Sequence, residues 1–135
     1  MVPSSGPRTV HWIDDMVGVA YISVRGPLAT FRDFIDAVDD LIAHPRWRTG
    51  MPIVEDLRPC PSDPPSGALH EWRAYVARRR PFLEGSRWAV VLPPNRFSSI
   101  DILDKASSDA AAAGLALQRF TSMTRAHLWV AGDSA

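Results

Sequence analysis

The sequence predicts one α/β domain, with a mixed, mostly parallel five-stranded sheet and about four helices. Short apolar runs alternate along the chain with segments of helical periodicity, and the last three runs stand about one helix apart. This spacing is typical of parallel strands, because a parallel pair needs a crossover of about a dozen residues or more. A chain of 135 residues with 46% hydrophobic residues also has the size and composition of a single domain with one core.

Five runs rich in β-branched and aromatic residues are the expected strands. They are Thr9–Ile13, Val17–Arg25, Met51–Asp56, Trp88–Leu92 and Leu115–Phe120. The first two form an antiparallel hairpin that turns at Asp14–Asp15. Gly26–Pro27 ends the second strand, since proline has no amide hydrogen to donate to a neighbouring strand. The remaining strands are expected to be parallel to the second.

Helices are predicted between these runs, where apolar residues recur every three or four positions. The first begins with Thr30 as its N-cap and ends at His44–Pro45. The others are expected at Ala68–Arg80, from Ser98 or Ser99 to Ala113, and from Thr121 to Val130. Ser66 and Thr121 are candidate N-caps for two of them. Gly114 is the expected C-terminal stop of the third helix.

Composition limits the classes of partner. Fifteen basic residues balance fifteen acidic ones, so no net field attracts nucleic acid or anionic membranes. No stretch approaches the roughly 20 apolar residues of a spanning helix, so membrane insertion is not expected. Cys60 is the only cysteine, which fits a reducing cytoplasm. Residues 1–8 are expected to be a flexible arm and residues 9–131 a single domain.

The sequence contains no arrangement of residues that identifies an enzyme. Cys60, Asp63 and His70 can be drawn as a nucleophilic set. However, nothing in the sequence assures Cys60 of the nearby cation or helix N-terminus that activates a thiol. The four histidines match no metal-ligand spacing, and no glycine-rich phosphate loop follows a strand. We therefore expect no catalytic residues, no metal and no cofactor.

Glu55 and Asp56 come at the end of the third expected strand, where ligands of open α/β sheets often bind. Adjacent strand residues point to opposite faces, so the two carboxylates cannot act as an acid/base pair on one substrate. Asp56 is expected to accept hydrogen bonds from amides of the following turn. Arg58 is a candidate ion-pair partner for it.

The order of elements, together with the segments His44–Trp47 and Met51–Arg58, resembles the STAS-domain superfamily, and more closely the small stand-alone bacterial proteins called SpoIIAA-like. The resemblance extends from Val17 to Val130. It implies a non-enzymatic, intracellular module that binds a protein partner and has a regulatory role.

In the anti-sigma-factor antagonists of that superfamily, a strand aspartate is followed ten residues later by a serine that a partner kinase phosphorylates. The corresponding pair here is Asp56 and Ser66, although Pro64–Pro65 replace the first two residues of the family's Asp-Ser-Ser-Gly turn. Ser66 is thus either an ordinary N-cap or a phosphorylation site. The resemblance implies a partner surface made of Arg58, Ser62, Asp63, Ser66, Gly67 and His70.

An alternative function is suggested by the outline that this superfamily shares with lipid-transfer domains. In this interpretation the protein carries a lipid or another apolar small molecule in a cleft between helices and sheet. The cleft would be lined by Trp47, Trp72, Phe82, Phe97 and Met123. The same residues can equally be ordinary core residues. A homodimer formed through a sheet edge or a helix face is also compatible with the sequence.

Overall fold

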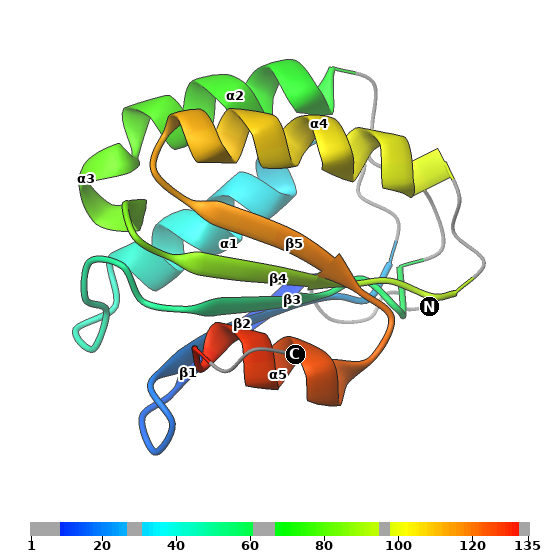
Figure 1. Cartoon of the computed structure of the whole chain (residues 1–135). Coiled ribbons are helices and arrows are strands. Elements are labelled where there is room, and N and C mark those ends of the chain that lie inside the picture. Colours follow the sequence, from blue (N-terminus) through cyan, green and yellow to red (C-terminus); the bar gives the residue numbers. More distant parts are fainter. Residues whose placement is uncertain (1–8, 27–30, 61–66, 95–97, 133–135) are drawn as a thin grey trace, which may run out of the picture.

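The computed structural model describes residues 9–26, 31–60, 67–94 and 98–132, with side chains from residue 101 onward in the last segment. It is an α/β fold with a five-stranded mixed sheet, as the sequence predicts (Figure 1). The strands are β1 (Thr9–Asp14), β2 (Val19–Val24), β3 (Ile53–Asp56), β4 (Arg87–Val91) and β5 (Ala116–Phe120). The helices are α1 (Arg32–Ile42), α2 (Ala68–Arg78), α3 (Arg80–Leu83), α4 (Ser98–Ala112) and α5 (Met123–Val130).

The strands lie side by side in chain order, from β1 at one edge to β5 at the other. β1 pairs with β2 in the antiparallel direction, and β2 to β5 are parallel. Each crossover therefore leads to the next strand in the same direction along the sheet. Crossovers of the same handedness then place their helices on the same face. Accordingly, α1, α2 and α4 lie on one face of the sheet and α5 lies on the other (Figure 1).

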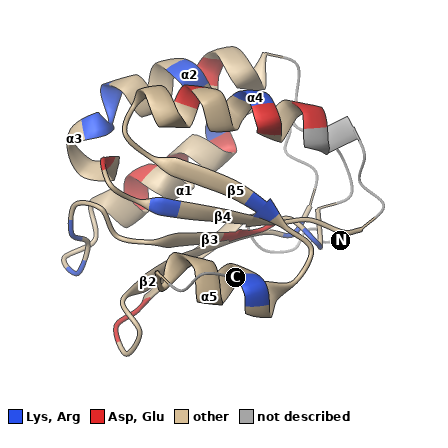
Figure 2. Cartoon of the chain, viewed as in Figure 1, with Lys and Arg blue, Asp and Glu red and all other residues tan. Residues whose placement is uncertain are grey.

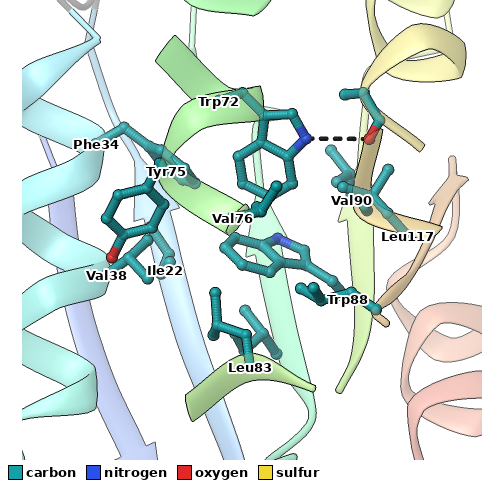
Figure 3. Close-up of a cluster of buried hydrophobic side chains, with 14 of the residues drawn as sticks. Ile22, Phe34, Val38, Trp72, Tyr75, Val76, Leu83, Trp88, Val90 and Leu117 are labelled. Carbon is teal, nitrogen blue, oxygen red and sulfur yellow. Dashed lines mark hydrogen bonds between the residues drawn. The ribbon is translucent and has the colours of Figure 1, made fainter. Parts of the chain in front are cut away.

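Two cores fill these two interfaces. The main core lies between the sheet and the helices α1, α2 and α4, and its centre is a pair of tryptophans (Figure 3). The rings of Trp72 and Trp88 meet edge to face with centroids 5.1 Å apart, a favourable geometry for aromatic pairs. The Trp72 indole donates a hydrogen bond of 3.0 Å to the Ala106 carbonyl, which ties α2 to α4. The smaller core lies between the sheet and α5.

The predicted helix Ala68–Arg80 is in fact two helices. It breaks at Arg79, where the backbone leaves helical geometry, and the four-residue α3 follows. Pro81, at the start of α3, is the physical reason. Proline lacks the amide hydrogen that a continuous helix would bond to the carbonyl of Ala77, whereas it fits well in the first turn of a new helix. The described residues thus form five helices, one of which is the four-residue α3.

The helix starts differ from the predicted N-caps at three places. The N-cap of α1 is Phe31 rather than Thr30, and that of α2 is Gly67 rather than Ser66. Thr30 and Ser66 lie outside the described residues. The N-cap of α5 is Ser122 rather than Thr121. Ser122 has extended geometry, and its hydroxyl accepts a 3.2 Å hydrogen bond from the amide of Arg125. An N-cap side chain must reach the amide two or three residues ahead. Because α5 begins at Met123, this position is occupied by Ser122 and not by Thr121.

Gly114 ends α4 as predicted. Its φ of +86° is in the left-handed region, and its amide donates to the carbonyl of Ala111 while the amide of Leu115 donates to the carbonyl of Ala110. These two bonds are those of a Schellman motif. The predicted arm, residues 1–8, lies outside the described part of the chain. In the described part, none of the helices combines the length and apolar character needed to cross a bilayer.

Candidate functional site

The candidate site is a cavity of about 70 Å³ between the sheet and the three helices on its main face. Its wall consists of apolar and aromatic side chains and one carboxyl group. The lining residues are Phe31, Phe34, Glu55, Leu57, Ala68, Leu69, Trp72, Ile102, Leu103, Ala106 and Leu117.

The topology explains why these residues meet. In a parallel sheet, each crossover helix begins near the carboxyl end of the strand before it. Except for Ala106, just past the middle of α4, the lining residues of α1, α2 and α4 come from the halves of these helices nearer their N-termini. The cavity therefore lies toward the carboxyl ends of the strands, which is the usual ligand-binding end of open α/β sheets.

Glu55 reaches this cavity because of the alternation of side chains along β3. Ile53 and Glu55 point toward the helices, whereas Val54 belongs to the smaller core on the other face. The Glu55 residue is only 9% exposed. Its Oε1 accepts a 2.9 Å hydrogen bond from the Trp88 indole, which is also buried.

Burial raises the pKa of Glu55 to about 7, even though the hydrogen bond from Trp88 acts to lower it. The cause is the loss of solvation of the charged form in an apolar environment. Near neutral pH the carboxyl group is therefore present in both its protonated and its ionised form. It can donate a hydrogen bond to a neighbouring molecule or accept one from it.

Asp56, the next residue, points away from this cavity and binds the turn that follows, as predicted. Its carboxylate accepts hydrogen bonds from the Arg58 amide at 3.0 Å and from the Arg58 guanidinium at 2.9 and 3.0 Å. Burial acts to raise the pKa of Asp56, but the hydrogen bonds and the opposite charge of Arg58 outweigh it and hold this pKa below its usual value. The two carboxyl groups thus have separate environments and separate roles.

The predicted partner surface is only partly described. Arg58, Gly67 and His70 are exposed at the protein surface. The Arg58 side chain keeps 47% of its surface accessible despite its ion pair with Asp56. Ser62, Asp63 and Ser66 lie outside the described residues.

The residues predicted to line one apolar cleft do not come together. Trp72 lines the cavity, whereas Trp47 packs at another part of the main core and Met123 packs in the smaller core across the sheet. Phe82, in α3, is 40% exposed, and Phe97 lies outside the described residues. Helical spacing shows that a residue is on an apolar face, but it does not show which face of the sheet that helix covers.

Sequence reasoning also missed Glu55 as a cavity residue. The available signal was its position between Ile53 and Leu57, two residues away on each side. Side chains at alternate strand positions share a face, so an apolar residue on each side of a carboxylate indicates a buried carboxyl group. This signal was weak because the opposite face of β3 carries an apolar residue as well, Val54.

The remaining candidates for chemistry are Cys60 and a metal site. Cys60 is buried, and its Sγ lies 3.6 Å from the carbonyl oxygen of Gly26 as a weak hydrogen-bond donor. Within the described residues, no group of three or more histidine, cysteine, aspartate and glutamate side chains is arranged to hold a metal ion.

Comparison with known proteins gives no independent assignment. No protein-family model matches the chain, and no curated protein matches it. The inference of function therefore depends on the residues of the site.

Proposed function

We propose that this protein binds a small apolar molecule, or the apolar end of a larger one, in the cavity that contains Glu55. The observation that carries the proposal is a single buried carboxyl group in an otherwise apolar cavity wall. Small-molecule sites have this composition: mostly hydrophobic and aromatic lining with very few polar groups that fix orientation. This is the alternative function that the sequence suggests, with a different set of lining residues.

The size of the cavity limits the ligand. Its volume is about 70 Å³, which is about half of the roughly 150 Å³ that holds a benzene ring in an engineered protein cavity. A short alkyl chain or the end of a longer one fits this space.

The electrostatics of the site favour a neutral polar group on the ligand. A ligand anion is disfavoured beside Glu55, because two carboxylates in one apolar site repel each other. A ligand cation loses its hydration on entry, and the attraction of one carboxylate offsets this cost only with excellent geometry. A hydroxyl or carbonyl group avoids both costs and forms one hydrogen bond with Glu55.

The proposal is tested with primary alcohols of increasing chain length, measured by the shift of the melting temperature and by native mass spectrometry. Alcohols that bind only the folded protein raise its melting temperature with concentration. Ala106→Leu fills the cavity and should abolish the shift, whereas Ala74→Leu on the exposed face of α2 adds the same volume elsewhere. Glu55→Gln keeps the shape of the cavity wall but removes the carboxyl group, so the same two measurements on this variant provide a second test. Equal shifts in the wild type and Ala106→Leu, or no shift with any alcohol, would contradict the proposal.

The second candidate is the STAS-like interaction and regulatory role, which stays a prediction. It is favoured by the exposed guanidinium of Arg58, which Asp56 holds in a fixed orientation at the surface. Two measurements test it: a search for a Ser66 phosphopeptide in protein isolated from its native cells, and identification of proteins that bind the wild type but not Arg58→Ala. The absence of both would contradict this role.

A further inference from the structure

A second concave surface, unrelated to the cavity, lies between the edge strand β1 and helix α1. We call it the edge groove. Its volume is about 560 Å³. One wall is the strand and the other is one side of the helix. The lining residues are Thr9, Val10, His11, Asp33, Asp36, Ala37 and Asp40.

β1 is a strand with no neighbour on its outer side among the described elements. Natural edge strands usually carry lysine, proline or a bulge that prevents pairing with another chain. The six residues of β1 contain no lysine and no proline, and their pairing with β2 runs without a bulge from Thr9 to Asp14. The outer backbone amides and carbonyls of β1 are thus suited to pair with an added strand.

Two polar atoms in this groove also have no partner. Of the four buried side-chain atoms without a hydrogen bond in the described residues, two belong to β1: Thr9 Oγ1 and His11 Nδ1. His11 lies on the side of β1 that faces α1, because its Nε2 is 3.7 Å from the carboxylate of Asp40. Buried polar atoms in native proteins nearly always have a partner. Both atoms are already covered by this chain's own atoms, so an occupant of the groove would meet the backbone edge of β1 and the helix wall rather than these two atoms.

The helix wall of the groove is acidic. Asp33, Asp36, Ala37 and Asp40 recur with helical spacing and form one stripe along α1. The three carboxylates are exposed, and α1 carries acidic residues along its length (Figure 2). Asp36 forms an ion pair with Arg32, whose Nε lies 3.0 Å from the Asp36 carboxylate. The groove therefore favours a positively charged occupant.

We propose that an extended segment of a partner protein adds a strand to β1 and directs lysine or arginine side chains at alternate positions toward α1. Strand addition explains the bare edge, since backbone hydrogen bonds supply affinity and alternate side chains supply specificity. Charge complementarity explains the acidic stripe. A second copy of this chain is a poorer occupant, because two-fold pairing of β1 with itself brings the same acidic stripes toward each other.

The test uses a fluorescent peptide of alternating lysine and valine, six residues long like β1, and measures its binding by anisotropy. Two control peptides carry glutamate in place of lysine or N-methyl groups on alternate amides, which block strand pairing. The protein variant is Asp33→Asn with Asp40→Asn. Its matched control is Asp101→Asn with Asp104→Asn, which removes two exposed charges from α4 instead. Amide hydrogen exchange locates the bound peptide.

We expect the lysine peptide alone to bind and to slow hydrogen exchange in β1. The groove variant should bind it about 2- to 30-fold more weakly, as expected for the loss of two exposed ion pairs, and the α4 control should bind as the wild type does. No binding at about 1 mM peptide, equal binding of either control peptide, or equal weakening in both variants would overturn the proposal. A dimer that already protects the β1 amides without peptide would overturn it too.

Discussion

Replacing Glu55 with glutamine should change how the stability of this protein depends on pH. Glutamine has nearly the same shape as glutamate and can still accept the hydrogen bond from the Trp88 indole, but it does not ionise. Any constant effect of the substitution, such as an unpaired amide in the cavity, is the same at every pH. The difference between the two proteins therefore isolates the ionisation of one buried group.

The expected magnitude follows from the pKa of Glu55, which is about 7 in the folded protein against an ordinary value of 4.5. This difference corresponds to about 3 kcal/mol of unfolding free energy. Between these two values the folded state binds more protons than the unfolded state. The wild type therefore loses stability as pH rises from about 4.5 to about 7, and the loss is complete above that range. Glu55→Gln loses none of this contribution.

Urea unfolding at several pH values, followed by tryptophan fluorescence, measures the effect. The unfolding free energy of Glu55→Gln relative to the wild type should increase by about 3 kcal/mol between acid and slightly alkaline pH. Glu71→Gln, on the exposed side of α2, is the matched control and should follow the wild type. Parallel pH curves for Glu55→Gln and the wild type would refute the reasoning, because they would mean that Glu55 ionises as if it were solvated.

Three further substitutions test other parts of the structure. Tyr75→Phe removes the 2.6 Å hydrogen bond from the Tyr75 hydroxyl to Asp39 and should lower the unfolding free energy by about 1–2 kcal/mol in urea. Gly114→Ala forces a side chain into a φ of +86° with its Cβ 3.0 Å from Glu84 Cγ, so a loss of about 1–2 kcal/mol is expected in the same assay. Asp56→Asn removes a carboxylate of lowered pKa, which stabilises the fold above its usual pKa and stops doing so as pH falls. The variant should therefore lose less stability than the wild type below about pH 4, and an unchanged acid transition would contradict this.

Much of the fold was predictable from sequence because local signals agreed with one another. Every expected strand overlaps an observed one, with boundaries that differ by one or two residues. Gly114 and the Asp56–Arg58 pair were also predictable, since turn chemistry depends on residues close in sequence. The short helix α3 is harder to predict, because the basic run before Pro81 is also typical of the end of a single helix. The effect of this proline is to start a new helix.

The candidate site was harder to predict because it depends on which face of the sheet each element covers. Glu55 and Val54 alternate along β3, and the sequence does not say which of them faces the three crossover helices. Met123 and Trp72 each belong to an amphipathic helix, yet they pack on opposite faces. The edge groove likewise depends on the placement of β1 beside α1. This placement joins residues more than twenty positions apart in the chain.

The sequential order of the strands determines when the cavity forms during folding. Each strand pairs with its neighbour in the chain, so the sheet can grow by adding one strand and helix at a time, with modest loop-closure cost at each step. The cavity wall, however, takes residues from α1, α2 and α4 and from β5. It is complete only when the last crossover has docked. A molecule bound there would therefore stabilise the fully assembled domain and none of the partly folded states.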